Sequence, residues 1–461
     1  MSPEKSCREA GRNAYKETLQ KLFVLKRFGV KLDLKGPARA LRLLGNPQLA
    51  YPSVHIGGTN GKGSTCAMTA DILQKNGLRV GLFTSPHLNR FTERIKINSK
   101  EIEEQEVADL FEEVSRLDPD LTFFERTALI AFTYFCRKSV DIAVVEVGLG
   151  GRLDVTNLVQ PVVTGILQIA HDHTAYLGRE ISRIAWEKAG ILRPGIPAAI
   201  APGESTEAKT VLKRMAAARS TPAYFWGEEF HMISENDEGP WTYTGPGGPL
   251  VVKSLGLKGS HQVQNAATAL ALTGLLEGRL KASRKARIEG LADVKWPGRG
   301  EIILLEDNKK VLLDGCHNPA AAQALTELLD NMEYENLHVV IGAMSDKDLE
   351  ATLVPLAKRA RNAFVTRVSY YRSCSVEELI RRIASAAPDT RVSAIVPVDK
   401  AVMKALAISA KEDLVVIAGS FFLVGEAKRI LANDNSDPFQ VTDPVHPPEI
   451  PRSKSSKPVE Q

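Results

Sequence analysis

The amino-acid sequence predicts an α/β protein with two parts. The larger part carries a phosphate-binding loop (P-loop) and a mainly parallel sheet, and a smaller C-terminal Rossmann-like α/β domain follows it. From about residue 51, apolar strand-like runs alternate with helix-length segments, which is the pattern of parallel βαβ units. The chain has 461 residues, more than one hydrophobic core usually organises. The Pro- and Gly-containing segment "VKWPGRGEI" (294–302) has the composition of a linker between two alternations.

These observations set the expected domain boundaries. We assign residues 1–295 to the first domain and residues 296–433 to the second. Residues 434–461 are rich in Pro, Ser and charge, so they can bury little apolar surface and are predicted to form a disordered tail.

The elements of the first domain follow from composition and pattern. A Gly-rich loop at 55–65 opens a helix, and the aromatic, Gly and Pro residues of 225–258 indicate short antiparallel strands. The remaining elements are strands within 78–85, 140–148 and 161–170, and helices within 124–139 and 261–278. In the second domain the strand candidates are "KVLLDGCH" (310–317), "LHVVIGAMS" (337–345), "NAFVTRVS" (362–369), "SAIVPV" (393–398) and "DLVVIAGSF" (413–421).

Composition excludes several classes of protein. The formal charge of +4 is small for this length and gives no reason to expect a nucleic acid or an anionic membrane as partner. Five scattered cysteines without CxxC spacing argue against a disulfide framework and a zinc site, and fit a reducing cytosol. The charged N-terminus does not look like a signal peptide, and no run of 18 apolar residues suggests a membrane span. We therefore expect a cytoplasmic protein.

The loop "HIGGTNGKGST" (55–65) resembles a phosphate cradle in which one residue differs. In the usual pattern the lysine is followed by Ser or Thr, whose hydroxyl holds magnesium, whereas Lys62 is followed by Gly63. A Gly-rich turn is the alternative, but the lysine and the strand-to-helix context favour phosphate binding. The metal ligands must then come from elsewhere.

Polar residues follow two of the predicted strands. Glu146 ends the strand at 140–148, where its carboxylate can reach magnesium, although a solvated strand-end acid is an equal alternative. His171, Asp172 and His173 follow the strand at 161–170 and belong to the same crevice. Lys188 lies in a helical segment, and its ordinary interpretation is a lysine snorkelling from a helix face.

Seven motifs together resemble one family. They are "GGTNGKGST", "TSPHLNRFTERIKIN", "EVGLGGRLDVTN", "DHTAYLG", "EKAGI", "HQVQNAATAL" and "LDGCHNP". Their order and register are similar to those of folylpolyglutamate synthases and dihydrofolate synthases, within the Mur ligase superfamily. The resemblance covers about residues 30–430 and implies a Mur-ligase-like P-loop domain followed by a glutamate-ligase domain.

The resemblance implies a nucleotide and metal site. ATP phosphates would be held by Gly61, Lys62, Gly63 and Ser64. One Mg²⁺ would be held by Ser85 and Glu146, and a second by His173. Lys188 matches a lysine whose side-chain nitrogen is carboxylated in related enzymes, which turns a cation into an anion able to support Mg²⁺.

The resemblance also implies contacts across the domain boundary. Asn265, Arg299 and Asp314 match nucleotide contacts, whereas His317 and Ser420 match positions around the incoming glutamate. The expected catalytic residues are Lys62, Lys188, Asp314 and His317. For His317, capping of a helix near Pro319 is the alternative.

For a pterin-bearing substrate, the resemblance implies a cleft with seven contributing residues. They are Thr122, Phe123, Phe124, Glu125, Arg152, Leu153 and Asp154. Phe124 can stack on a flat pterin and Asp154 can accept hydrogen bonds from its ring nitrogens. Phe123 and Phe124 can equally be core aromatics.

The predicted function is that of an ATP-dependent amide ligase. It would add L-glutamate to 7,8-dihydropteroate, forming dihydrofolate, and to tetrahydrofolate, forming polyglutamates, in both cases through an acyl phosphate. A folylpolyglutamate synthase without the first activity is the alternative. A non-catalytic nucleotide-binding switch or transport ATPase is the rival from another class. Small-molecule substrates are the expected partners, with the chain acting as a monomer.

Overall fold

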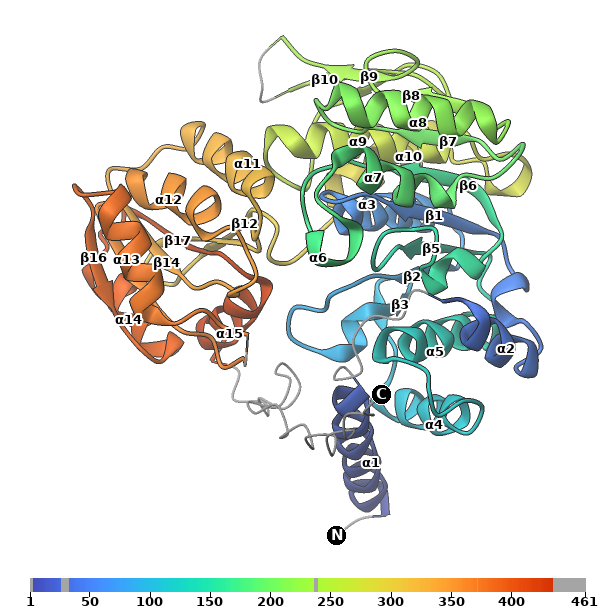
Figure 1. The fold of residues 1–461 in the computed structure, drawn as a ribbon, viewed down its shortest axis with the longest axis horizontal. Helices are drawn as coiled ribbons and strands as arrows, with labels where there is room; N and C mark the ends of the chain where they lie inside the picture. Colours follow the sequence, from blue (N-terminus) through green and yellow to red (C-terminus); the bar gives the residue numbers. More distant parts are fainter. Residues whose placement is uncertain (1–2, 26–32, 236–238, 371, 434–461) are drawn as a thin grey trace, which may run out of the picture.

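The computed structural model describes residues 3–25, 33–235, 239–370 and 372–433. The predicted tail at 434–461 lies outside the described residues. Figure 1 shows two α/β bodies, with the strands of residues 53–252 in one and the strands from residue 301 onward in the other. The α/β class and the mainly parallel sheet of the first body are as predicted.

The first body is built on an eight-stranded sheet whose centre is parallel. In spatial order its strands are β4 (Lys100–Glu101), β3 (Ile95–Ile97), β2 (Val80–Phe83), β5 (Ile142–Glu146), β1 (Ser53–Gly57), β6 (Pro161–Ile166), β7 (Ala198–Ile200) and β8 (Ala223–Phe225). Helices cover both faces, and β1 and β5 are buried along their whole length, which explains their continuous apolar sequences. The predicted strands within 78–85, 140–148 and 161–170 are β2, β5 and β6.

Alternation along the central strands divides the core between the two faces. Val54 and Ile56 of β1 pack in one cluster with apolar residues of α3 and α9, whereas Ala143 and Val145 of β5 pack in another with α5. The helices of this body are α1 (Pro3–Leu25), α2 (Lys35–Leu43), α3 (Lys62–Lys75), α4 (Glu104–Ser115), α5 (Phe123–Arg137), α6 (Thr174–Leu177), α7 (Ile181–Lys188), α8 (Thr206–Ala218), α9 (Ser260–Gly274) and α10 (Arg284–Asp293). The predicted helices within 124–139 and 261–278 are α5 and α9.

The segment 225–258 forms the predicted antiparallel strands. β9 (His231–Ile233), β10 (Trp241–Thr244) and β11 (Leu250–Val252) make a three-stranded sheet of their own. Inward-facing Trp241 and Tyr243 alternate with exposed Thr242 and Thr244, so one face packs on the core and the other meets solvent.

The second body is a six-stranded sheet with helices on both faces. In spatial order its strands are β12 (Glu301–Leu304), β13 (Lys310–Asp314), β17 (Leu414–Ala418), β14 (Leu337–Ile341), β15 (Asn362–Val365) and β16 (Arg391–Ala394). All neighbours are parallel except β12, which pairs antiparallel with β13 at the edge. The helices are α11 (Pro319–Asp330), α12 (Leu349–Arg359), α13 (Val376–Ala386), α14 (Val398–Ile408) and α15 (Phe421–Leu431).

Four of the five strands predicted in this body are confirmed in place, and the fifth is displaced. The strand expected within 393–398 ends at Ala394, because Pro397 has no N–H for the ladder and α14 begins at Val398. The sequence analysis did not assign β12, which lies partly in the segment taken as a linker.

One buried cation joins the small antiparallel sheet to helices α9 and α10 of the first body. The Arg287 side chain of α10 is 1% exposed, and its guanidinium donates to the carbonyl oxygens of Pro246, Gly247 and Leu270, each at 2.9 Å. Burial lowers the pKa of this guanidinium. We expect Arg287→Met to reduce the free energy of unfolding by about 3 kcal/mol or more, because buried carbonyls lose their donors.

Urea denaturation followed by circular dichroism measures this loss. The control is Arg284→Met on the same helix, whose exposed side chain makes one bond, to the Pro249 carbonyl oxygen at 2.7 Å. It should cost less than about 1 kcal/mol. Equal losses in the two variants would contradict the role given to Arg287.

Candidate functional site

The Gly-rich loop runs from the end of β1 into α3. Gly61, the residue before the first helical position, has a φ of 84°, in the left-handed region that favours glycine. A Cβ at Gly61 would overlap the side-chain oxygen of Asn265 on α9. The loop backbone therefore turns tightly and lies against α9, with the first N–H groups of α3 at its mouth, which fits a cradle for phosphate groups.

Two lysines converge on one carbonyl oxygen of this loop. Lys62 Nζ donates to the carbonyl oxygens of Gly58, at 3.1 Å, and Thr59, at 2.9 Å. Lys188 Nζ donates to the same Gly58 oxygen at 2.6 Å. Lys188 is 5% exposed, and burial, assisted by the charge of Lys62, lowers its pKa to about 7. The interpretation of Lys188 as a snorkelling surface lysine is wrong.

Glu146 lies beside the loop, at the end of β5. It is 3% exposed, and its Oε2 accepts a hydrogen bond from the Ser85 backbone N–H at 2.9 Å. Burial raises the pKa of the carboxyl, and the charge of Lys62 opposes that rise. The alternative of a solvated strand-end acid is wrong, and Ser85 and Glu146 are neighbours, as predicted.

The part of the chain that the structure describes holds no group of three His, Cys, Asp or Glu side chains placed to bind a metal. The predicted ligand set uses one Ser, one Glu, one His and a modified lysine, so it does not depend on such a group. The adjacent Ser85 and buried Glu146 offer hard oxygen donors, which suit Mg²⁺. His173 has a φ of 50° at the start of α6, an uncommon conformation for a residue with a side chain.

The predicted nucleotide residues outside the loop come from both bodies. Asn265 donates to Gln262 Oε1 at 3.0 Å, and Gln262 donates to Ser64 Oγ at 3.4 Å. Asp314 ends β13 and accepts from the Gly300 N–H at 2.8 Å. Arg299 is half-buried, with its guanidinium 4.2 Å from the centroid of the Phe421 ring.

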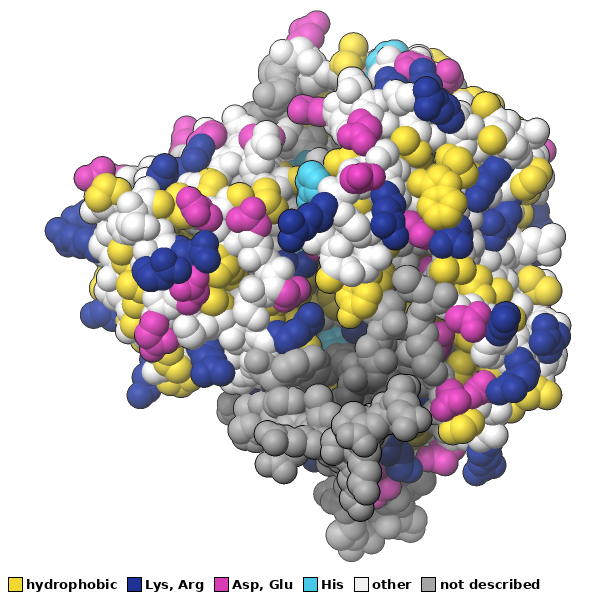
Figure 2. All heavy atoms as spheres, viewed as in Figure 1, with side chains coloured by type: hydrophobic (Ala, Val, Ile, Leu, Met, Phe, Trp, Pro, Cys, Tyr) yellow, Lys and Arg dark blue, Asp and Glu magenta, His cyan; other side chains and the backbone are white. Residues whose placement is uncertain are grey.

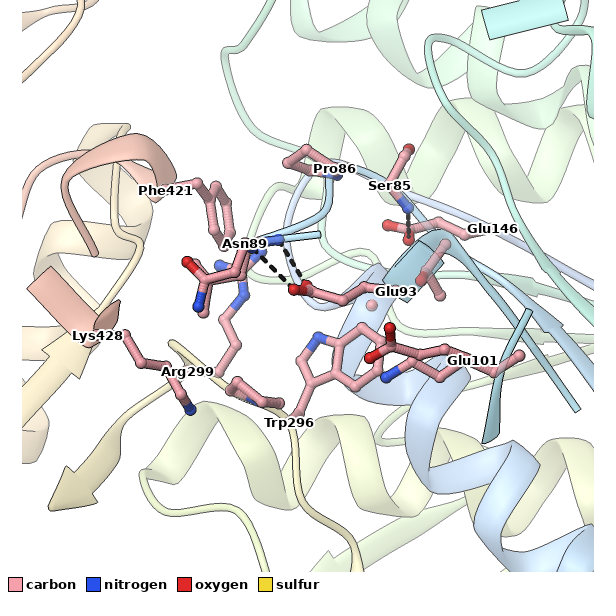
Figure 3. Close-up of a pocket in the computed structure, with 15 residues that line it drawn as sticks. Ser85, Pro86, Asn89, Glu93, Glu101, Glu146, Trp296, Arg299, Phe421 and Lys428 are labelled. Atoms are coloured by element: carbon pink, nitrogen blue, oxygen red, sulfur yellow. Dashed lines mark hydrogen bonds between the residues drawn. The ribbon is translucent and has the colours of Figure 1, made fainter. Parts of the chain in front are cut away.

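A cavity of about 140 Å³ lies between the bodies and is lined by Gly63, Ser85, Glu146, Trp296, Arg299 and Phe421, among others. Figure 3 shows Arg299 and Phe421 on one side of it and the hydrogen-bonded pair of Ser85 and Glu146 on the other. Lys and Arg side chains also border the hollow between the bodies in Figure 2. Trp296 and Phe421 were not predicted as site residues, although Trp296 lies in the "WPGRG" motif.

His317 does not cap the helix that follows it. Its Nδ1 lies 2.9 Å from the Gly315 carbonyl oxygen, and its Nε2 lies 3.4 Å from Asp172 Oδ2. The cap of α11 is Asn318, whose Oδ1 accepts from the Ala321 N–H at 2.9 Å. The capping interpretation of His317 is therefore wrong, and the residue is brought to the loop that contains His173, as expected for one site.

Several residues predicted to touch substrate hold loops in place in this structure. Thr122 and Glu125 form a capping box at the start of α5, with the Thr122 N–H donating to Glu125 Oε2 at 2.6 Å. Ser420 Oγ accepts from the Leu423 N–H at 3.2 Å and caps α15. "T-x-x-E" is a known capping signature that the sequence analysis overlooked.

Asp154 and Arg152 are likewise engaged by the protein. The Asp154 carboxylate accepts from the N–H groups of Leu149, at 2.8 Å, and Thr156, at 2.9 Å. Arg152 pairs with Glu187 through Nη2 and Oε1 at 2.9 Å and lies over the Trp186 ring. The "GLGGRLD" loop is thereby fixed against the end of α7, which carries Lys188.

The remaining predicted acceptor residues differ in burial. Phe123 is part of the core of the first body, so its core interpretation is confirmed. Phe124 is only partly buried and lies against Gly148, where a Cβ would overlap its ring. Leu153 is also partly buried. Of the two aromatics, Phe124 is the less buried.

Two family models match this chain, one in each body. The model of the Mur ligase middle domain matches residues 56–273, and that of the Mur ligase glutamate ligase domain matches residues 298–421. A dihydrofolate synthase/folylpolyglutamate synthase of Buchnera aphidicola is 32% identical over 425 residues, covering 89% of this chain and 95% of that protein. The chain belongs to this family.

Other relatives and solved structures agree with the assignment. A probable bifunctional folylpolyglutamate synthase/dihydropteroate synthase of Haloferax volcanii is 32% identical over 90% of this chain, which spans 50% of that longer protein. The structure of E. coli FolC in complex with DHPP and ADP has a TM-score of 0.80 at 30% identity, with 88% of this chain and 95% of that chain covered. A structure of a bifunctional folylpolyglutamate synthase/dihydrofolate synthase with Mn, AMPPNP and L-glutamate bound has a TM-score of 0.77 at 30% identity, with 89% of this chain and 96% of that chain covered.

No helix in the described part of the chain combines the length and apolar character that a membrane span requires.

The geometry of the family's phosphate loop predicts the effect of one methyl group. Gly61→Ala should weaken ADP binding at least about tenfold, because the φ of 84° strains a residue with a side chain and the Cβ overlaps Asn265. Isothermal titration calorimetry measures the affinity. The control is Gly77→Ala, at a φ of 85° with nothing within 4 Å, which carries the same strain away from the loop. An ADP affinity equally reduced in both variants would refute the steric argument.

Proposed function

We propose that the chain is an ATP-dependent amide ligase that joins L-glutamate to 7,8-dihydropteroate and, separately, to tetrahydrofolate, in each case through an acyl phosphate. Support comes from relatives named for both activities and from related structures with ADP and DHPP or with AMPPNP and L-glutamate. The observation that carries the proposal is the convergence of Lys62 and Lys188 on the Gly58 carbonyl oxygen beside the buried Glu146. A nucleotide-binding switch or transport ATPase would not need the acceptor and glutamate sites.

The proposal assigns the phosphate groups of ATP to the loop. Gly61, Gly63 and Ser64 would present backbone N–H groups, and Lys62 would leave its carbonyl partners to neutralise the β- and γ-phosphates. Asn265, Arg299 and Asp314 would hold the remainder of the nucleotide from α9 and from the second body. ATP and the acceptor carboxylate are both anions, so approach of the carboxylate oxygen to the γ-phosphorus requires this concentration of cations.

The residues present fit two Mg²⁺ ions, one held by Ser85 and Glu146 and the other by His173 with a carboxylated Lys188. When bound, the metal ions would offset negative charge on the phosphoryl group during transfer. The protein fixes these donors beforehand through the Ser85 N–H bond to Glu146 and the burial of Lys188. A divalent metal accompanies AMPPNP in a related structure, which supports the requirement for a metal.

Acceptor and glutamate would meet next to these groups. Phe124, Arg152 and Leu153 would contact the pterin-bearing acceptor. Thr122, Phe123, Glu125 and Asp154, whose side chains are engaged by the protein, would shape the walls of its cleft. Ser420 and His317, at the mouth of the second body, would orient the glutamate amine for attack on the acyl phosphate carbonyl carbon, which releases phosphate. Enclosure between the bodies would keep water from hydrolysing that intermediate. We also propose a monomer located in the cytosol.

The test of the function is substrate dependence. Purified enzyme with Mg·ATP should release phosphate only when both a reduced pterin acceptor and L-glutamate are present, and mass spectrometry should show glutamate added to dihydropteroate and to tetrahydrofolate. Lys62→Ala should reduce turnover at least about 100-fold without unfolding, because a fixed charge on the phosphates is lost. ATP hydrolysis that ignores the acceptor and glutamate would sink the ligase assignment. Use of only one acceptor would restrict it to that activity.

Carboxylation of Lys188 has a separate test. Because its pKa is about 7 instead of 10.5, the amine is largely neutral above pH 7 and can attack CO₂, whereas the ammonium form below pH 7 cannot. Carbon NMR with isotope-labelled bicarbonate should show a carbamate signal that fades as the pH falls below 7 and is absent from Lys188→Ala.

Activity provides the complementary readout for this modification. Lys188→Ala should lose activity and recover part of it with added formate or acetate, which replaces the missing carboxylate, whereas Lys62→Ala should not recover. A wild-type enzyme without the carbamate signal, together with an unrescued Lys188→Ala, would exclude the modification.

A further inference from the structure

Three loops of the first body, each at the carboxyl end of a parallel strand, are held from across the cleft by the second body. They are the loop after β1, which contains Asn60, the loop after β2, which contains Leu88, and the loop after β6, which contains Asp172. The same loops carry Lys62, Ser85 and His173, which are the proposed phosphate and metal residues. The three residues that hold these loops, Asn318, Gly425 and Lys347, have no role in the proposed function so far.

The phosphate loop is held by a reciprocal pair of amides. Asn318 Nδ2 donates to Asn60 Oδ1 at 2.9 Å, and Asn60 Nδ2 donates back to Asn318 Oδ1 at 3.3 Å. Asn318 is 3% exposed and is fixed by its own bond to the Ala321 N–H, so it offers a rigid partner. Asn60 lies two residues before Lys62, the first residue of α3, within the same loop.

The loop after β6 is held by charge. Asp172 Oδ1 accepts from Lys347 Nζ at 2.6 Å, and Asp172 Oδ2 lies 3.4 Å from His317 Nε2. Both partners of the Lys347 pair are largely buried, with side-chain exposed fractions of 15% for Lys347 and 10% for Asp172. A largely buried ion pair with such geometry loses much more when one partner is removed than an exposed pair does.

The loop after β2 is held by packing. The Leu88 side chain is buried within the apolar cluster of the second body, next to Val424 on α15. A Cβ at Gly425 would overlap the Leu88 carbonyl oxygen, so the backbone of the loop lies directly on the helix at this position. Ser85 is three residues before Leu88 and shares this anchored loop. A larger residue than glycine at 425 would push the loop, and Ser85 with it, away from Glu146.

We propose that Asn318, Lys347 and Gly425 are positioning residues of the ligase site: each fixes, from the second body, one loop of the first body that bears a phosphate or metal residue. The inference rests on the proposed function for its catalytic consequences, but the positioning of the loops can be measured without ligase activity. The bodies also touch away from these loops, where Ser260 Oγ of α9 donates to Glu327 Oε2 of α11 at 3.0 Å. The contacts of Asn318, Lys347 and Gly425 differ from that one, because each falls on a loop that carries Lys62, Ser85 or His173.

The variants remove each contact while keeping the local fold. Asn318→Asp retains an N-cap for α11 but loses the donor to Asn60 and places two oxygens face to face. Its control, Asp348→Asn, makes the reverse exchange at the cap of α12, where the side chain accepts from the Ala351 N–H. Lys347→Met removes the ammonium group that pairs with the Asp172 carboxylate. The control is Lys358→Met at an exposed position, and Lys347→Arg is the conservative rescue. Gly425→Ala adds one methyl group to a helix, where alanine is favoured over glycine.

Two measurements are made on the full chain. Hydrogen exchange of the loops at 58–63, 84–90 and 170–175 reports their order without requiring any reaction. Steady-state kinetics then separate kcat from KM for ATP. Each site variant should raise exchange in its own loop and lower kcat/KM for ATP about tenfold to 100-fold, with an unfolding midpoint within a few degrees of wild type. Lys347→Arg should restore most of the loss, and both controls should behave as wild type.

The outcomes separate this inference from the proposed function. Unchanged exchange in the three loops, or a loss of kcat/KM in the controls equal to that in the site variants, would overturn the positioning role. If the wild-type enzyme binds ADP but ligates no glutamate, the proposed function fails, and loop exchange with calorimetric ADP affinity still decides the inference. If Asn318→Asp unfolds, Asn318→Ser, which also caps a helix, takes its place under the same criteria.

Discussion

Two lysine side-chain nitrogens donate to one backbone carbonyl oxygen, that of Gly58, and the proposed site is arranged around them. Lys62 and Lys188 donate to it at 3.1 and 2.6 Å, and their mutual repulsion adds to burial in bringing the pKa of Lys188 to about 7. Such a pair is tolerable only with anions nearby, and Glu146 and Asp172 supply part of that charge. Phosphate groups would supply the remainder, which favours the ligand that the loop is proposed to bind.

The parallel sheets explain why these groups meet. In both bodies the strands that carry site residues, β1, β5 and β6 in one and β13 and β17 in the other, end at the cleft. Helices follow those ends, so the first N–H groups of each face the same space and need an acceptor, which is a side chain or, at α3, the phosphate groups that the loop is proposed to bind. Asn318 and Ser420 meet that need in the second body. A residue at the mouth of such a cleft can thus be fixed because it caps a helix, even where it never touches a ligand.

This geometry also marks where sequence reasoning succeeded and where it did not. The phosphate loop, the buried strand ending at Glu146 and the helix α9 were predictable, because each is encoded by neighbouring residues with a recognisable pattern. The burial of Lys188 was not, since its partner, the Gly58 carbonyl, is 130 residues away. The caps at Thr122 and Asp154 had a local signal, "T-x-x-E" and an Asp two residues before a bonded N–H, but resemblance directed attention to substrate contacts instead. Lys347 had no local signal, because its significance depends on Asp172 in the other body.

Separation of the two bodies would leave the site electrically incomplete. Burial opposes ionisation of Asp172, and the pKa of Asp172 nevertheless lies below its usual range because His317 and Lys347 of the second body act on it together with His173 of its own loop. Arg299, on the segment between the bodies, is half-buried and interacts by charge with Asp314 and Glu146, which belong to different sheets. Each body thus supplies charged partners to groups of the other body. A buried charge that loses its partner costs several kcal/mol. Contact between the two bodies is therefore favoured, and it is this contact that brings the second body next to the phosphate loop and the Glu146 carboxylate.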